Sequence, residues 1–123
     1  MVQLRTVLQP ADNSGAKKLR VIHIYGGSRR PKGGLADTVL VSAIAADPHG
    51  QVKKGEKYTA VIVRSRKETR RIDGSYIRFD DNAAVIIDPK TKEPVGTRVF
   101  GPIAREVKEA GFARIASLAA EVV

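Results

Sequence analysis

Turn-forming residues interrupt the first hundred residues at short intervals, and this limits the fold more than any other feature of the sequence. Short apolar, β-branched runs bounded by Gly, Pro, Asn and Asp are typical of strands. We expect strands over Leu4–Leu8, Leu19–Tyr25, Thr38–Ala46, Tyr58–Val63 and Ala83–Ile87. Few of these runs alternate cleanly between polar and apolar residues, and no helical segment precedes residue 101. The pattern therefore predicts a mainly β chain whose sheet closes into a small barrel.

Asp73-Gly74 is the strongest hairpin signal in the sequence, because both central residues of a type I′ turn need positive φ. It predicts a hairpin that pairs Thr69–Ile72 with Ser75–Arg78 and places Arg71 opposite Tyr76. The segments on either side are polar on both faces. We therefore expect a hairpin that projects from the barrel and has no core of its own to cover.

The chain changes character after residue 100. Gly101-Pro102 predicts a helix start, because proline at the first helical position lacks only an N–H that would be unpaired there anyway. Apolar residues then recur at helical spacing, in two groups separated by Gly111: Ile103, Ala104, Val107 and Ala110, then Phe112, Ile115, Ala116 and Ala119. We expect one domain over residues 1–123, with the barrel over about 1–100 and a short C-terminal helical region over about 101–123.

Basic residues are concentrated in the first two thirds of the chain. The formal charge is +9, from 22 Lys+Arg and 13 Asp+Glu. Residues 1–78 hold 16 basic and 6 acidic residues, or +10, whereas residues 79–123 hold 6 and 7, or −1. Such a local excess is the usual electrostatic footprint of a nucleic-acid-binding protein. An anionic membrane surface fits less well, because the basic segments contain Gly and Pro and form no amphipathic helix.

Composition and spacing disfavour most other classes of protein. The absence of cysteine excludes disulfide scaffolds, thiolate metal sites and cysteine nucleophiles, and it suits a reducing cytosol. No apolar run approaches the ~20 residues of a membrane span, and the N-terminus lacks the apolar region of a signal peptide. His23 and His49 show no triad-like spacing, and Asp80 and Asp81 face opposite sides of a strand. We therefore expect no enzyme activity, no catalytic residue, no metal and no cofactor; a small hydrolase would need a pocket lined by histidine or paired carboxylates.

The aromatic residues favour one mode of nucleic-acid binding. There are three tyrosines and three phenylalanines, several of them at expected core positions. Single-strand binders normally display a cluster of aromatic rings for base stacking, and this chain has none. We therefore expect recognition of folded RNA by shape and backbone, with a merely solvated basic hairpin as the alternative. The expected RNA-binding residues are Lys17, Lys18, Arg29, Arg30, Lys32, Lys53, Lys54, Arg64, Arg66, Lys67, Arg70, Arg71 and Arg78.

Short motifs in a fixed order are a second line of evidence. Residues 11–16 read Ala-Asp-Asn-Ser-Gly-Ala and residues 26–28 read Gly-Gly-Ser. A central block contains Ala60-Val61-Ile62-Val63, Asp73-Gly74, Phe79 and Asn82-Ala83-Ala84-Val85-Ile86. Residues 96–102 read Gly-Thr-Arg-Val-Phe-Gly-Pro, and residues 117–119 read Ser-Leu-Ala. Across its whole length the sequence resembles the L-fourteen family of large-subunit ribosomal proteins.

The resemblance implies a closed five-stranded β-barrel with a small C-terminal helical region. It implies direct binding to large-subunit rRNA, intersubunit bridges to small-subunit rRNA and contact with a neighbouring large-subunit ribosomal protein. It also implies a protein-partner surface, at Thr97, Arg98 and Arg114, that can receive a ribosome-silencing factor. The alternative is a free translation factor that binds RNA through a similar small barrel.

Membrane binding and homo-oligomers are not expected. Because no transit peptide is seen, we expect a cytoplasmic ribosome, bacterial rather than organellar. Two positions depart from the family pattern, since Ile72 and Ala120 stand where proline is usual. The strand at residues 20–25 also lacks a cysteine often found there. These departures leave the expected fold unchanged.

Overall fold

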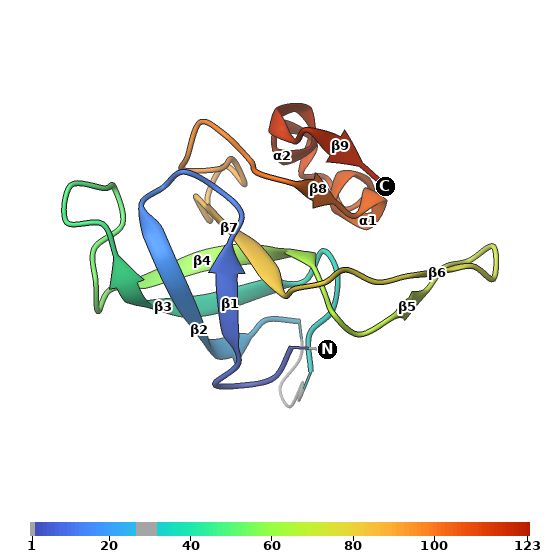
Figure 1. Ribbon diagram of the computed structural model, residues 1–123, viewed down its shortest axis with the longest axis horizontal. Helices are drawn as coiled ribbons and strands as arrows, with labels where there is room; N and C mark the ends of the chain where they lie inside the picture. Colours follow the sequence, from blue (N-terminus) through green and yellow to red (C-terminus); the bar gives the residue numbers. More distant parts are fainter. Residues whose placement is uncertain (1, 27–31) are drawn as a thin grey trace.

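Five strands close into a barrel at the centre of the computed structural model, which describes residues 2–26 and 32–123. The order around the barrel is β1-β2-β3-β4-β7 (Figure 1), formed by β1 (Val7–Pro10), β2 (Ala16–Ile24), β3 (Thr38–Ala46), β4 (Lys57–Arg64) and β7 (Ala83–Ile87). Neighbouring strands are antiparallel except β1 and β7, which pair in parallel and close the barrel. The expected mainly β fold with a closed five-stranded barrel is confirmed.

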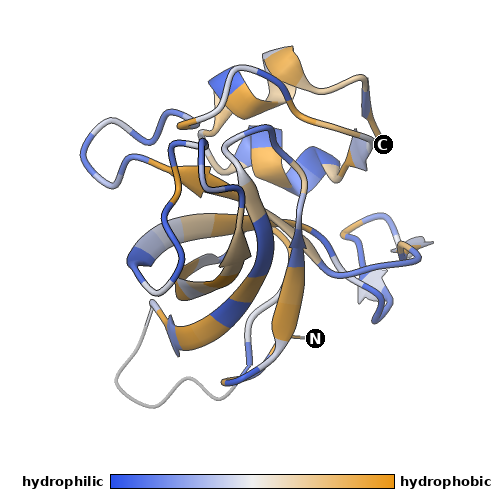
Figure 2. Ribbon diagram, turned by 60° about the vertical axis from the view of Figure 1, so that its left-hand side comes forward, coloured by the Kyte–Doolittle hydropathy of each residue, from blue (hydrophilic) through white to orange (hydrophobic). Residues whose placement is uncertain are grey.

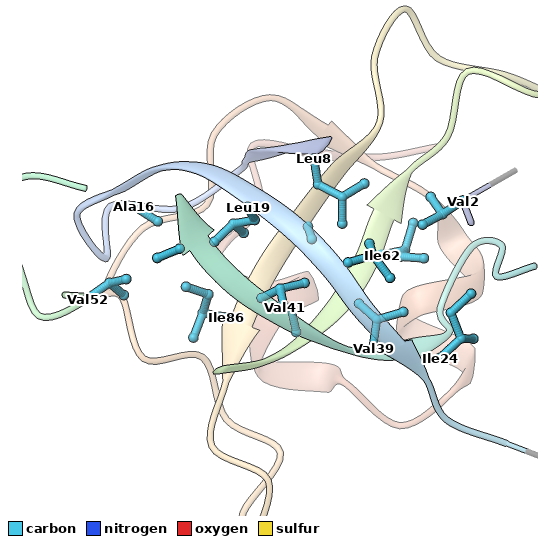
Figure 3. Close-up of a cluster of buried hydrophobic side chains, with 14 residues drawn as sticks. Val2, Leu8, Ala16, Leu19, Ile24, Val39, Val41, Val52, Ile62 and Ile86 are labelled. Atoms are coloured by element: carbon cyan, nitrogen blue, oxygen red, sulfur yellow. The ribbon is translucent and has the colours of Figure 1, made fainter. Parts of the chain in front are cut away.

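Side chains from all five strands meet inside the barrel. In β3 the burial alternates, and Val39, Val41 and Ala43 are fully buried, as the period of two along a strand requires. Members from the other four strands complete this inner cluster, among them Leu8, Leu19, Ile62 and Ile86 (Figure 3). Val2 and Val52 lie at opposite ends of the cluster, so segments outside the strands also help to close the barrel.

β4 and β7 have buried residues on both faces, and in β7 all five residues are buried. Ala84 and Ile86 belong to the inner cluster, whereas Val85 and Ile87 belong to a second cluster outside the barrel. That outer cluster is completed by C-terminal residues, namely Val99, Ile103, Val107, Phe112 and Ile115. The sequences of β4 and β7 thus lack alternation between polar and apolar residues because one face lies in the barrel interior and the other lies under a covering layer.

The covering layer consists of β8 (Pro102–Ile103), α1 (Arg105–Glu109), α2 (Ala113–Leu118) and β9 (Glu121–Val122), with β8 and β9 paired in parallel. The expected helix start at Gly101-Pro102 is wrong. The N–H of Ala104 donates to Val63 O (3.1 Å) and that of Val123 to Ile103 O (2.9 Å), so this segment pairs with strands. The first helix begins only at Arg105, and Gly111, with φ of 100°, separates the two helices as expected.

No helix in the described ranges is long and apolar enough to cross a membrane.

β5 (Thr69–Arg70) and β6 (Tyr76–Ile77) form the projecting hairpin (Figure 1). The register differs by one residue from the expected one, because Arg70, not Arg71, lies opposite Tyr76. Gly74 has φ of 88°, its N–H donates to Arg71 O (3.0 Å), and Arg71 N–H donates to Ser75 O (2.8 Å). A three-residue loop with glycine in the left-handed region therefore replaces the two-residue type I′ turn. The Ser75 hydroxyl and N–H both donate to Asp73, which lowers the pKa of that carboxyl.

β1 begins three residues later than expected. Leu4 lies in a turn and is 55% exposed, and Pro10, expected to end the strand, belongs to it. Proline fits there because Gln9 and Ala11 donate their N–H groups to the carbonyls of Asn82 and Ala84, at the start of β7, while pairing with β2 ends at Leu8. No ladder hydrogen bond is lost to the missing N–H.

Asp12 is a buried carboxylate that links the turn after β1 to β7. It is 5% exposed; Oδ2 accepts the N–H of Ile86 (3.0 Å) and Oδ1 accepts the hydroxyl of Ser14 (2.8 Å). Burial raises the pKa of Asp12, and the hydrogen bonds from Ser14 and Ile86 oppose that rise. Part of the motif at residues 11–16 is therefore explained by barrel closure.

We predict that Asp12→Ala lowers the free energy of unfolding by about 1–3 kcal/mol, because it leaves the buried N–H of Ile86 without an acceptor. Urea denaturation followed by far-UV circular dichroism measures the change. The matched control is Asp80→Ala at an exposed carboxylate, which should stay within about 0.5 kcal/mol of the parent. Equal stability of the two variants would contradict the assigned role of Asp12.

Candidate nucleic-acid interface

The β5–β6 hairpin carries an exposed group of basic side chains, Arg66, Lys67, Arg70 and Arg78. No residue of β5 or β6 belongs to either of the described core clusters, so the strands have no hydrophobic anchor. Figures 1 and 2 show the hairpin standing away from the barrel, with mostly hydrophilic residues along it. Lys67 and Glu68 form an ion pair of 3.5 Å with both side chains about half exposed, and such pairs contribute little to stability. The four basic groups are therefore available to a polyanion.

The base of the hairpin is fixed by two hydrogen bonds, one to the Asn82 side chain and one between backbone groups. The N–H of Arg66 donates to Asn82 Oδ1 (2.9 Å) and that of Phe79 to the carbonyl of buried Ser65 (2.9 Å). These bonds join the two strands of the hairpin where they leave β4 and approach β7. The exposed cations thus start from a rigid part of the barrel.

Two expected RNA-binding arginines have partners inside the fold. Arg64, with its side chain only 12% exposed, donates Nε and Nη2 to the two carboxylate oxygens of Asp81 (3.0 and 3.2 Å). Its Nη1 donates to the carbonyls of Phe100 (2.8 Å) and Pro102 (3.3 Å), and a Cβ at Gly101 would collide with the guanidinium. Arg71 pairs with Glu106 at 3.0 Å. We therefore leave Arg64 and Arg71 out of the proposed RNA-contacting set.

The outer face of β2 carries a second basic group. Lys17, Lys18 and Arg20 are all exposed, although adjacent residues of a regular strand face opposite sides. Register irregularities between Ala16 and Lys18 and between Lys18 and Leu19 turn both lysines outward, as β-bulges do. Both lysines were predicted from the sequence as RNA-binding residues, but nothing in the sequence pattern predicted the bulges.

The remaining expected cations are spread around the molecule. Lys53 and Lys54 are exposed in the loop between β3 and β4, at the opposite end of the molecule from the hairpin (Figure 1). Lys32 is exposed ahead of β3, and Arg29 and Arg30 lie outside the described residues. The structure therefore gathers the hairpin cations but does not bring Lys53 and Lys54 to them.

Asn13 builds the loop that carries Thr97 and Arg98. Its Oδ1 accepts the N–H of Thr97 (2.8 Å) and of Arg98 (3.0 Å), and its Nδ2 donates to Thr97 Oγ1 (2.8 Å). Both side chains of this loop are exposed, as is Arg114 on α2. This role of Asn13 was not predicted from the sequence. The available signal was its position next to Asp12 in a turn, where asparagine side chains often bond to backbone groups.

The two histidines are exposed, and His23 places its ring edge-on to Tyr25 with centroids 5.0 Å apart. Among the described residues no group of three His, Cys, Asp or Glu could hold a metal ion. Asp81, one of the adjacent carboxylates, pairs with Arg64. Among the described residues, the candidate site therefore consists of exposed basic side chains.

The chain is a mainly β protein that consists of a small closed barrel, a basic hairpin and a covering C-terminal layer. The family model described as "Ribosomal protein L14p/L23e" matches residues 1–123, and the chain belongs to this family of ribosomal proteins. Among curated proteins it is similar to the large ribosomal subunit protein uL14 of Petrotoga mobilis (strain DSM 10674 / SJ95). The two are 62% identical over 122 residues, which is 99% of each chain. The resemblance noted from the motifs is confirmed.

Proposed function

We propose that this structural ribosomal constituent binds large-subunit rRNA directly and contributes to intersubunit bridges with small-subunit rRNA. The observation that carries the proposal is the β5–β6 hairpin, which presents Arg66, Lys67, Arg70 and Arg78 without any core beneath it. An arm of this kind reaches into folded RNA, where phosphate contacts supply affinity and position. Lys17, Lys18 and Arg20 on β2 add a second contact surface.

The proposed location is the large subunit of a bacterial cytoplasmic ribosome, which agrees with the name and source of the relative. We predict that the chain stays with that subunit in stoichiometric amount after a high-salt wash, because contacts to bases, sugars and neighbouring protein persist when salt weakens the phosphate contacts. Sucrose-gradient fractionation measures this retention. Release of the chain into the soluble fraction would instead support a free RNA-binding factor.

We predict that replacing Arg66, Lys67 and Arg70 together by Gln weakens rRNA binding and flattens its salt dependence. Each lost phosphate contact reduces the slope of log K against log salt by about 0.7–0.9. Binding to a large-subunit rRNA fragment at several salt concentrations gives the slope. The matched control replaces Lys90, Lys92 and Lys108, with the same change in charge on the near-neutral part of the chain. A slope equal to the parent's in the hairpin variant would mean that the arm is only solvated.

The Thr97–Arg98 loop and Arg114 are proposed as the surface for protein partners, including a neighbouring ribosomal protein and a ribosome-silencing factor. We predict that Thr97→Ala with Arg98→Ala leaves rRNA binding within about twofold of the parent. Of the two side chains only that of Arg98 is charged, so at most one ionic contact to a phosphate is lost. Binding to the silencing factor should weaken, as measured by calorimetry. Asn13→Ala, which removes the support of the loop and none of its exposed side chains, should weaken the same binding. Loss of rRNA binding in the Thr97/Arg98 variant would contradict this division of surfaces.

A further inference from the structure

We propose that Arg71 is a positioning residue that fixes the direction of the β5–β6 hairpin through Glu106 and Val123, rather than a contact to RNA. These three residues are called the latch below. The latch joins the hairpin to the C-terminal region and is a property of the free protein. Only its consequence for RNA affinity rests on the function proposed above.

A single nitrogen of Arg71 contacts both of the other latch residues. Nη2 lies 3.0 Å from Glu106 Oε1 and donates to the backbone oxygen of Val123 (2.6 Å). The side chains of Arg71 and Glu106 are 16% and 25% exposed, against 59% and 48% for the Lys67–Glu68 pair on the same hairpin. A pair shielded from water in this way is screened less by salt than an exposed one. The latch is therefore of a different kind from the surface ion pairs.

Val123 gives the latch a fixed point. Its N–H donates to Ile103 O (2.9 Å), and its backbone oxygen also accepts the N–H of Arg105 (3.2 Å). Ile103 is fully buried in the outer cluster that covers β4 and β7. The guanidinium of Arg71 thus connects the hairpin to backbone that is held on the core.

The hairpin depends on this connection, because it has little else beyond its base. A groove of about 270 Å³ separates it from the C-terminal region, with Thr69, Arg70 and Ile72 on one side and Arg105 and Glu109 on the other. Arg71 and Glu106 also line this groove, and their ion pair crosses it. Without the pair, the hairpin would keep its own strand pairing, its turn and the hydrogen bonds at its base, but would lose its described ion pair to the C-terminal region.

Each side chain of the pair also has one polar atom without a hydrogen-bond partner among the described residues. These atoms, Arg71 Nε and Glu106 Oε2, are both buried. A bond between them would give the side-on, two-bond pairing that Arg64 and Asp81 form at the hairpin base. Because buried polar atoms without partners are costly, formation of this second bond would remove that cost and stabilise the closed arrangement.

The experiment uses the absence of cysteine from the chain. Spin labels are attached to Ile72→Cys at the exposed hairpin tip and Lys57→Cys at the start of β4, and pulsed electron resonance measures the distance between them. We expect one narrow distribution in the parent background. Arg71→Ala should broaden it most, because this change removes the contacts to both Glu106 and Val123. Glu106→Ala should also broaden it, although the bond to Val123 remains, and the double variant should broaden it no further than Arg71→Ala.

Two matched controls lie beside the latch. Arg70→Ala removes a neighbouring hairpin cation, and Glu109→Ala removes an exposed carboxylate from the same helix and the same groove. Both should leave the distribution narrow. Circular dichroism and urea denaturation confirm that every variant remains folded. Distributions of equal width in the parent, Arg71→Ala and Glu106→Ala would overturn the proposal.

RNA binding distinguishes positioning from charge by the sign of the effect. Glu106→Ala raises the net charge by one, so electrostatic attraction alone predicts tighter binding to rRNA. The latch predicts weaker binding by about three- to tenfold, because the hairpin must then be ordered when RNA binds. Glu109→Ala, with the same charge change, should bind as tightly as the parent or more tightly. Tighter binding by Glu106→Ala would overturn the positioning role. If the parent itself bound no rRNA, the proposed function would fail while the distance measurement still tested the latch.

Discussion

The pairing of β4 with β7 is the constraint on which the rest of the structure depends. Both strands are buried on two sides, with Ile62 and Ile86 facing the barrel interior and Val61 and Val85 facing the C-terminal layer. Neither side can be left in water, since each buried aliphatic side chain contributes about 1.5–3 kcal/mol. The chain must therefore both close its barrel and fold its C-terminal region back over it. The outer face of β2, loops and the hairpin remain exposed, and they carry the basic groups described above.

Arginine has two physical roles in this small protein, and burial separates them. Arg64 donates four hydrogen bonds to Asp81 and two backbone carbonyls at the point where the hairpin leaves the barrel. Such planar, multiple bonding is what a guanidinium offers and an ammonium does not. Arg66 and Arg70 lie within a few residues of it and are exposed. A run of basic residues along a chain is thus partly framework and partly surface.

Much of this fold could be predicted from the sequence, because turn residues and β-branched runs act locally. Thr38–Ala46 and Ala83–Ile87 have the predicted bounds, and the second helix forms where apolar residues recur. Predictions from local sequence were wrong where hydrogen-bond partners distant in the sequence determine the backbone conformation. Pro102 begins no helix, because the segment after it bonds to Val63 in β4, and the backbone of Ile103 bonds to Val123. Likewise the bulges that expose Lys17 and Lys18 depend on β3, which lies more than twenty residues away.

The same limit applies to the proposed interface. In the sequence Arg71 is one more cation in a basic run. Its partners Glu106 and Val123 come from the C-terminal region, 35 and 52 residues later in the chain. The hairpin carries more exposed basic than acidic side chains, and none of the residues of β5 or β6 belongs to the described core clusters, so no apolar face holds it against the barrel. Holding such an arm in one direction by a shielded ion pair places the ordering cost in folding, where the buried core supplies it. For the proposed RNA binding, this would mean that the arm is already extended when RNA arrives, so that phosphate contacts need not first order it.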